Sequence, residues 1–157
     1  MDNDARDSVT VPDPFDLARF VSAQETNHAD ALAELRAGRK ATHWMWYVFP
    51  QHIGLGVSRN ALFYGIRSPE EARAYLAHPV LGPRLLETTR AVLAHPTKTL
   101  RAIFGTPDDM KFRSSMTLFA HSADDPAPFR EALSVFCAGQ PDFRTLELLA
   151  SPERDAR

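Results

Sequence analysis

Apolar residues recur at helical spacing along most of the chain. Leu81, Leu85 and Val92 mark one such stripe, and Phe129, Leu133 and their neighbours mark another, at steps of three and four residues. This period predicts amphipathic helices. No stretch alternates strictly between apolar and polar residues on both sides of a two-residue glycine turn, which is the pattern of a β-hairpin. The sequence therefore predicts an all-α fold, a compact single-domain bundle of about seven to eight short helices.

Capping residues predict where these helices begin. Ser68-Pro69-Glu70-Glu71 is the clearest signal, because Ser68 can accept from a first-turn amide while Glu71 reaches back to the serine amide. Thr106-Pro107-Asp108-Asp109 repeats this order and predicts a helix to about Ala120. Ser58 is expected to begin a helix that carries Ala61, Leu62 and Ile66. Further starts are predicted at Asp13-Pro14, Asn27, Thr97 or Thr99, Asp125-Pro126 and Asp142. Helix ends are predicted near Gly38, His78-Pro79, His95-Pro96, Gly105 and Gly139.

The segment THWMWYVFP, residues 42–50, is the densest apolar stretch. Trp, Tyr, Val and Phe favour strands, yet the chain offers no partner strand. Thr42 could begin a helix and Pro50 would stop it. A short buried helix is the favoured interpretation, and a strand stays the alternative, because periodicity does not separate the two in so short a run.

Size and charge fit one soluble domain. The 157 residues are 44% hydrophobic and 24% charged, with a net charge of −2. We expect a disordered N-terminal arm at 1–12, one helical domain at 13–149 and a flexible tail at 150–157. The balance of charge argues against a nucleic-acid partner, and no apolar run is long enough for a membrane helix. A single cysteine and the lack of a signal peptide predict a cytoplasmic protein.

Three blocks resemble a known family. GRKATHWMWYVFPQ, SPEEARAYLAHPVLGPRLLE and GTPDDMKFRSSMTLFA, in this order, are similar to the bacterial "domain of unknown function 1810" family, whose members are often labelled calpastatin. The resemblance spans about Phe15 to Leu149. It implies a mostly α-helical fold and assigns no activity.

The aromatic segment supplies the first candidate site residues. If it is helical, His43, Trp46, Tyr47 and Pro50 share one face. That face would join an imidazole, an indole and a phenol in a wall for a planar ligand. In a strand, His43 would group with Met45, Tyr47 and Phe49 instead. The alternative to a ligand site is a core histidine among packing aromatics.

The second group of candidates surrounds Lys111. Lysine is rare here, with Lys40, Lys98 and Lys111 set against fifteen arginines. On a helix Lys111 neighbours Ser114 and Ser115, and an ammonium beside hydroxyls suits a phosphate or a carboxylate. The alternatives are a surface pair of Lys111 with Asp108 and serines that bond to the preceding turn.

These residues lead to two functional hypotheses. The first is a pocket for a small anionic or nucleotide-like ligand between residues 43–51 and helix 107–120. The second is a structural or protein-interaction module with no small-molecule ligand. Neither includes a cofactor or a metal, because the six histidines show no HExxH spacing and no phosphate-binding glycine motif occurs. The expected pocket residues are His43, Trp46, Tyr47, Gln51, Lys111, Ser114 and Ser115; no catalytic residue and no reaction are predicted.

Overall fold

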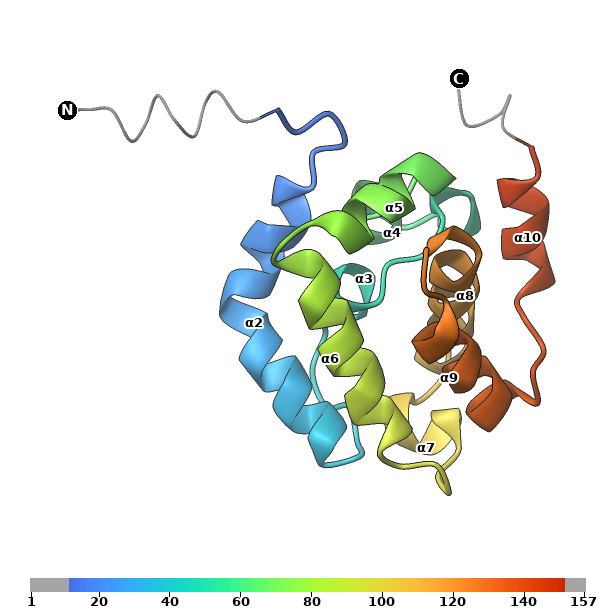
Figure 1. Cartoon of the computed structure of the whole chain (residues 1–157). Coiled ribbons are helices and arrows are strands. Elements are labelled where there is room, and N and C mark those ends of the chain that lie inside the picture. Colours follow the sequence, from blue (N-terminus) through green and yellow to red (C-terminus); the bar gives the residue numbers. More distant parts are fainter. Residues whose placement is uncertain (1–11, 152–157) are drawn as a thin grey trace.

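A computed structural model describes residues 12–151. Within this range the chain forms nine α-helices, one short 3-10 helix and no β-strand, so the predicted all-α class is confirmed (Figure 1). The expected arm at 1–12 and tail at 150–157 lie outside the described residues, apart from Pro12, Ala150 and Ser151.

Most helices are short. The first half of the chain forms α2 (Ala18–Arg36), α3 (Met45–Val48), the 3-10 helix η1 (Ile53–Leu55), α4 (Arg59–Phe63) and α5 (Pro69–Ala77). The second half forms α6 (Leu81–Leu93), α7 (Leu100–Phe104), α8 (Asp108–Ser122), α9 (Ala127–Cys137) and α10 (Phe143–Leu149).

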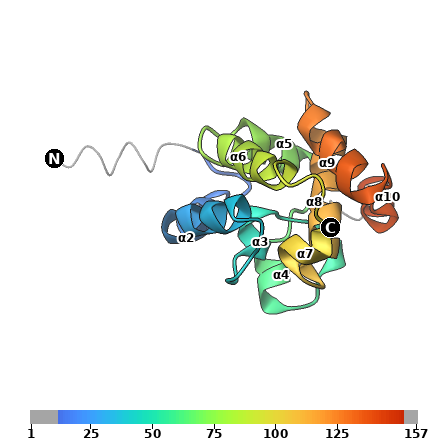
Figure 2. The same ribbon diagram turned by 90° about the horizontal axis from the view of Figure 1, so that it is seen from below.

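The helices surround a centre made by α3 and α8. In Figure 1, α2 lies on the left, α6 crosses the front, and α9 and α10 lie on the right. Figure 2, seen from below, places α5 and α6 on one side of α3 and α8, and α4 and α7 on the other. The aromatic segment and the Lys111 helix, well separated in the sequence, are thus neighbours at the centre of the fold.

Several predicted helix caps are confirmed, namely those in which the capping residue lies within three residues of the group that it binds. The side chains of Ser58, Ser68, Thr99 and Asp142 each accept a hydrogen bond from the amide three residues later, at 3.0–3.1 Å. Gly38, Gly105 and Gly139 end their helices with positive φ angles of 79°, 74° and 74°. A left-handed conformation favours glycine because it has no Cβ to clash.

Not all predicted helix starts are right. The first helix does not begin at Asp13-Pro14 but at Ala18, although the Asp13 carboxylate accepts from the amides of Leu17 and Ala18 at 2.7 and 3.0 Å. Asn27 does not begin a second helix, since α2 runs unbroken from Ala18 to Arg36. The side-chain amide of Asn27 donates to the Ala23 carbonyl of the same helix, 3.1 Å away. No proline or glycine interrupts that stretch, so an asparagine alone does not break it. Thr106 does not cap α8 either. Its hydroxyl donates to the Asp109 carboxylate at 2.8 Å, and Pro107 occupies the N-cap position.

The helix predicted from Ser58 is shorter than expected. It ends at Phe63, and Ile66 lies beyond it. Ile66 forms backbone hydrogen bonds with the chain at the start of η1, accepting from Ile53 at 2.8 Å and donating to Gln51 at 3.0 Å. These bonds close the base of a loop, residues 53–65. Gly65 is needed there, because a Cβ at this position would lie 2.5 Å from the Ile53 side chain.

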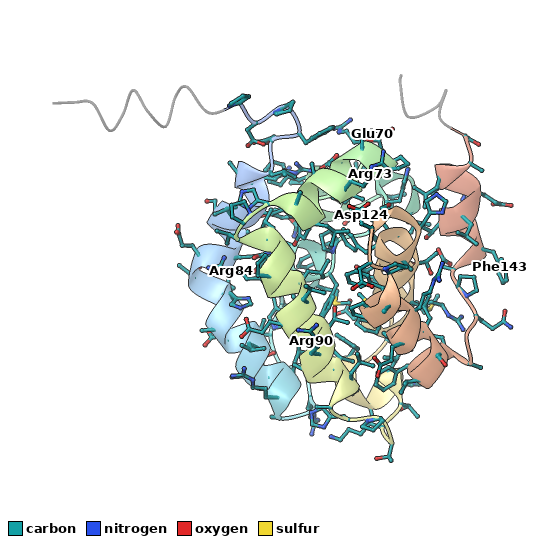
Figure 3. The ribbon with its side chains drawn as sticks, viewed as in Figure 1. Glu70, Arg73, Arg84, Arg90, Asp124 and Phe143 are labelled. Carbon is teal, nitrogen blue, oxygen red and sulfur yellow. The ribbon has the colours of Figure 1, made fainter. Side chains whose placement is uncertain are left out.

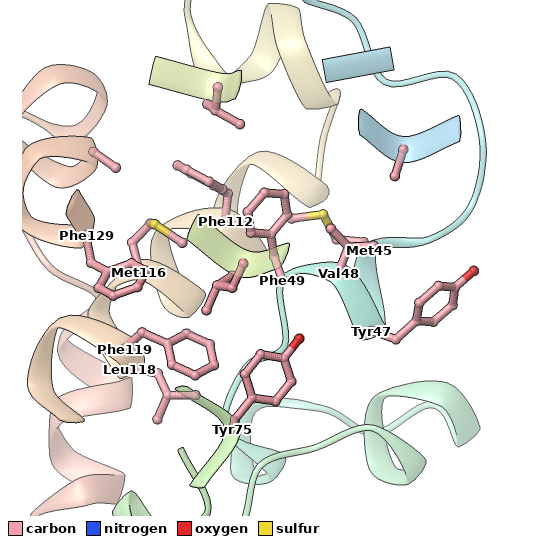
Figure 4. Packing of buried hydrophobic residues seen from close by; sticks show 14 of the residues in the cluster. Met45, Tyr47, Val48, Phe49, Tyr75, Phe112, Met116, Leu118, Phe119 and Phe129 are labelled. Carbon is pink, nitrogen blue, oxygen red and sulfur yellow. The ribbon is translucent and has the colours of Figure 1, made fainter. Parts of the chain in front are cut away.

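Aromatic side chains from five helices, α2, α5, α7, α8 and α9, and from the aromatic segment fill the core. The ring centroid of Phe49 lies 5.0 Å from that of Phe112 and 5.8 Å from that of Phe104. Tyr75 similarly packs 5.1 Å from Phe20 and 5.3 Å from Phe119. Figure 4 shows Phe49 turned towards Phe112, with Tyr47 apart from this cluster at α3. Buried aromatic area of this kind is a major part of the stability of the fold.

One buried arginine ties the start of α2 to the loop and α5. Arg19 donates to the carbonyls of Phe15, Asp16, Phe63 and Gly65 and to the Glu71 carboxylate, at 2.7–3.0 Å. All five guanidinium N–H groups are therefore used. The second carboxylate oxygen of Glu71 accepts from the Arg67 backbone amide at 3.0 Å. The capping-box pattern predicts instead a bond from the Ser68 amide.

Candidate functional site

The segment before α3 is held by Glu34 of α2. Its carboxylate accepts from the amides of Ala41 and Thr42 at 2.7 and 3.0 Å, from the Thr42 hydroxyl at 2.6 Å and from the Trp44 indole at 2.9 Å. Partial burial works to raise the pKa of Glu34, but these hydrogen bonds outweigh it and lower the pKa from 4.5 to about 2. Glu34 thereby fixes the position from which the aromatic segment starts.

The aromatic segment is a helix of one turn, which confirms the favoured interpretation over a strand. It begins at Met45 with Trp44 at the N-cap, so Thr42 does not cap it. The side chains of Trp44, Met45, Val48 and Phe49 are buried in the core.

The helical face predicted for His43 does not form. His43 precedes the helix, so the three-residue spacing that would align it with Trp46 does not apply. Its side chain is exposed. The Tyr47 side chain does not lie beside those of His43 and Trp46 either. Its ring packs 5.3 Å from that of Tyr64, and its hydroxyl donates to the His43 carbonyl at 3.4 Å. Burial, and to a lesser degree the neighbouring Tyr64, raises the pKa of Tyr47.

Trp46 lines a narrow cavity between α3, α4 and α8. Its walls also include Gln51, Tyr64 and Lys111. The space open to water is about 10 Å³, which holds roughly one water molecule. A planar ligand enters this space only if the loop that carries Tyr64 shifts.

A wider cavity adjoins the narrow one and shares Gln51 and Lys111 with it. It has a volume of about 280 Å³ and lies between the loop and the N-terminal half of α8. Arg113, Ser114 and Asp142 contribute its polar walls, and the remaining lining residues are Leu55, Pro107 and Met110. Two cations, Lys111 and Arg113, and one aspartate, Asp142, therefore line a space large enough for a small molecule.

Lys111 belongs to a cluster with Asp108 and Lys40. The Asp108 carboxylate lies 3.0 Å from Lys40 Nζ and 3.5 Å from Lys111 Nζ, with the Lys40 side chain 8% exposed and that of Lys111 27% exposed. Each ammonium also lies over an indole ring, Lys40 5.1 Å from the centroid of Trp44 and Lys111 5.4 Å from that of Trp46. One carboxylate is shared by two ammonium groups, so the cluster keeps a net positive charge next to both cavities.

The hydroxyls beside Lys111 differ in their surroundings. Ser114 donates to the Met110 carbonyl at 3.1 Å, which is the bond to the preceding turn that the sequence left open as an alternative. Ser114 lines the wider cavity, and its hydroxyl oxygen can accept a further hydrogen bond. Ser115 is fully buried and lines neither cavity.

Buried polar atoms around the cavities lack partners. The indole nitrogen of Trp46, Nε of Arg113 and the hydroxyl of Ser115 have no hydrogen-bond partner among residues 12–151. The Arg113 guanidinium does hydrogen-bond to Cys137, whose thiol pKa is nevertheless raised by burial. An unsatisfied buried polar group costs about 1–3 kcal/mol. Trp46 lines the narrow cavity and Arg113 lines the wider one, so these two unsatisfied groups belong to residues that border the cavities.

The structure thus brings some of the expected pocket residues together and separates others. Trp46, Gln51, Lys111 and Ser114 line the adjoining cavities, whereas His43, Tyr47 and Ser115 do not. Lys40, Tyr64 and Asp142 join the site without having been expected there. The rarity of lysine had singled out Lys40 in the sequence. Its proximity to Lys111 could not be predicted, because the two lysines are joined only by their shared contact with Asp108.

The described residues contain neither a candidate metal site nor a membrane-spanning helix. Between Pro12 and Ser151, no three His, Cys, Asp or Glu side chains are gathered in a way that suits a metal ion. None of the helices in this range has the length and apolar character needed to cross a membrane.

Comparison with known proteins confirms the resemblance found in the sequence. The family model described as "Protein of unknown function (DUF1810)" matches residues 14–149. A crystal structure of the conserved hypothetical protein Rv1873 from Mycobacterium tuberculosis is similar, with a TM-score of 0.86 and 53% sequence identity over 88% of this chain and 99% of that one. A comparison with curated proteins finds no match. The family model covers most of the chain, so this protein belongs to the DUF1810 family of proteins of unknown function.

Proposed function

We propose that this protein binds a small anionic ligand in the wider cavity, with Lys111 and Arg113 as the cationic contacts. The observation that carries the proposal is the set of unsatisfied buried groups at this place. Trp46 and Arg113 each have an N–H group without an acceptor among residues 12–151, and both residues line cavities that meet at Lys111. A ligand that brings phosphate or carboxylate oxygens offers those acceptors.

Charge supports an anion rather than a neutral molecule. Lys111 has three N–H donors, and Asp108, its ionic partner within the described part of the chain, is also bound by Lys40. Donors of Lys111 therefore remain for a ligand. Arg113 adds a guanidinium whose planar shape suits two oxygens of one phosphate or carboxylate group.

A nucleotide-like ligand fits if its ring enters the narrow cavity. There it would lie between Trp46 and Tyr64, while its phosphate occupies the wider cavity beside Lys111 and Arg113. Since the narrow cavity admits about one water molecule, ring binding requires loop 53–65 to open. The exposed position of His43 argues against the earlier expectation that its imidazole joins this site.

The second hypothesis, a structural or protein-interaction module, also has support. Lys111 contacts both Asp108 and Trp46, and the hydroxyls of Ser114 and Thr117 bond to the preceding turn of α8. In that case these polar groups only stabilise the packing of α8.

A thermal-shift screen of nucleotides, sugar phosphates and dinucleotides separates the two hypotheses. A ligand at about 100 times its Kd stabilises the fold by about 2.7 kcal/mol, which raises the Tm of a domain this size by about 5–10 °C. Ligand binding predicts such a shift for at least one anionic compound. No shift with any anionic compound at millimolar concentration contradicts it.

Two lysine variants make the screen specific. Lys111→Met keeps most of the packing over Trp46 and removes the charge, so it should abolish the ligand-induced shift. Lys98→Met is the matched control, because Lys98 donates to the Gly38 carbonyl at 3.1 Å at the end of α2. The control should lower the Tm of the free protein and keep the ligand-induced shift.

A further inference from the structure

A second groove lies between α2 and α6, away from the cavities described above. It has a volume of about 670 Å³. Three arginines line it, Arg36 from α2 and Arg84 and Arg90 from α6, together with one acidic residue, Glu87. Figure 3 shows Arg84 and Arg90 on α6. Apolar residues also line the groove, among them Leu86 and Ala91.

The carboxylate in the groove is already engaged. Glu87 accepts from His28 at 3.0 Å and lies 3.7 Å from Arg36. Arg90 is exposed, and its guanidinium has no ion pair or hydrogen bond with any residue from 12 to 151. The chain as a whole carries a net charge of −2, so this groove is a local excess of positive charge on an acidic protein.

A hydrogen bond to the buried side chain of Gln24 holds Arg84 in place. Its guanidinium donates to the side-chain oxygen of Gln24 at 3.4 Å. Gln24 is buried, and its amide in turn donates to the Tyr47 carbonyl at 2.7 Å and to the Tyr75 hydroxyl at 3.1 Å. This network orients the arginine while most of its donors stay available to a partner.

The shape of the groove favours a chain segment over a small anion. Small-molecule sites bury about 70–90% of their ligand. Here Arg36, Glu87, Arg90 and Ala94 are exposed, so a single phosphate group would stay largely in solvent. Arg84 and Arg90 are six residues apart on α6, a separation of about 9 Å along the axis. In an extended segment of polyproline II conformation, acidic side chains three residues apart lie on one face and are about 9 Å apart, which matches.

We propose that the groove between α2 and α6 binds an extended acidic peptide segment of a partner protein. The carboxylates of the segment would pair with Arg84, Arg90 and Arg36, and its apolar side chains would cover Leu86 and Ala91. The site is independent of the proposed ligand cavity, because the two share no lining residue.

Fluorescence anisotropy with fluorescein-labelled decaglutamate tests the proposal on the full chain. At physiological ionic strength we expect binding with a Kd on the order of 10 μM. Arg90→Glu and Arg84→Met should each weaken binding by about tenfold or more. Arg59→Glu is the control for general charge, because Arg59 is exposed on α4 on the other side of the molecule and should change the Kd by less than about twofold.

Several results would overturn the proposal. One is no binding of decaglutamate at about 1 mM. Another is an equal loss of binding in Arg59→Glu, which would mean that general charge and not the groove attracts the peptide. Full displacement by inorganic phosphate at about 10 mM would identify a small-anion site instead. A dimer of the free protein that dissociates in Arg90→Glu would show that the groove is occupied by a second copy. Circular dichroism verifies that each variant is folded.

Discussion

Lys40 and Lys111 share one carboxylate, that of Asp108, although they come from segments far apart in the sequence. Asp108 Oδ2 lies 3.0 Å from Lys40 Nζ, and Oδ1 lies 3.5 Å from Lys111 Nζ. Lys40 is nearly buried and Lys111 is not. The contact therefore ties the segment before α3 to the start of α8 and places a partly free ammonium at the proposed ligand cavity.

Removing the shared carboxylate should destabilise the fold more than removing the exposed lysine. Asp108→Asn leaves the nearly buried Lys40 ammonium without an ionic partner, and we expect a loss of about 1–3 kcal/mol in the free energy of unfolding. Lys111→Met should cost less than about 1 kcal/mol, because the pair it breaks is more exposed. Urea unfolding of both variants measures the difference. Equal losses would show that Asp108 does not hold Lys40.

The Arg19–Glu71 pair should be among the most sensitive polar contacts in the protein. Its side chains are only 8% and 2% exposed, and Arg19 also binds four carbonyls. Arg19→Met leaves Glu71 buried and unpaired, and we expect a loss of about 3–5 kcal/mol.

An exposed pair on α5 is the matched control for this variant. Arg73 lies 3.4 Å from Glu70, and both side chains are largely in solvent. Arg73→Met should change stability by less than about 0.5 kcal/mol. Chemical unfolding of the two variants compares them directly, and a loss in Arg19→Met as small as in the control would contradict the structural role of the buried pair.

Glu34 should give the protein part of its sensitivity to acid. Its pKa is lower in the fold, about 2, than the ordinary 4.5, so the ionised carboxylate stabilises the protein above about pH 4.5. This contribution is lost as the pH falls towards about 2. In Glu34→Gln the loss of Tm over this range should be smaller than in the wild type.

A second glutamine variant controls for the general effect of acid. Glu70→Gln changes an exposed residue on α5 and leaves Glu34 and its hydrogen bonds intact, so its Tm should fall with pH as in the wild type. If Tm fell with pH by the same amount in the wild type and in Glu34→Gln, the hydrogen bonds around Glu34 would not lower its pKa.

The aromatic segment should respond to mutation mainly as core. Phe49 is buried against Phe104 and Phe112, and Phe49→Ala should cost about 3–5 kcal/mol. His43 is exposed, so His43→Ala should stay within about 0.5 kcal/mol of the wild type. Thermal unfolding checks both. A large loss in His43→Ala would contradict its exposed position.

Features encoded within a few residues could be predicted from the sequence. Ser68, Thr99 and Asp142 cap their helices because the acceptor and the amide that it meets are three residues apart. The all-α class followed from the same short-range spacing. Asn27 and Thr106 failed, since a residue able to cap also has other uses: one bonds to its own helix and the other to a neighbouring carboxylate.

The site was predicted only in part, because its arrangement depends on contacts between distant segments. Lys111 and Trp46 were expected at one pocket, and their side chains do meet there. His43 was misplaced because the helix starts two residues later than the spacing argument needs. The anchoring of the aromatic segment by Glu34 depends on a tertiary contact that no local pattern reveals.

The central claim, an anionic ligand held by Lys111 and Arg113 with Trp46 in the adjoining cavity, is tested most directly by the two indole N–H signals in a ¹H–¹⁵N NMR spectrum. Trp44 is buried and donates to Glu34 at 2.9 Å, whereas the Trp46 N–H has no acceptor within the described part of the chain. Trp46→Phe assigns the two signals. On titration with adenosine monophosphate, we expect the Trp46 signal to shift in a saturable way while the Trp44 signal stays in place, and Lys111→Met to abolish the shift. A Trp46 signal that does not move with adenosine monophosphate, inorganic phosphate or any compound of the thermal-shift screen would contradict the claim.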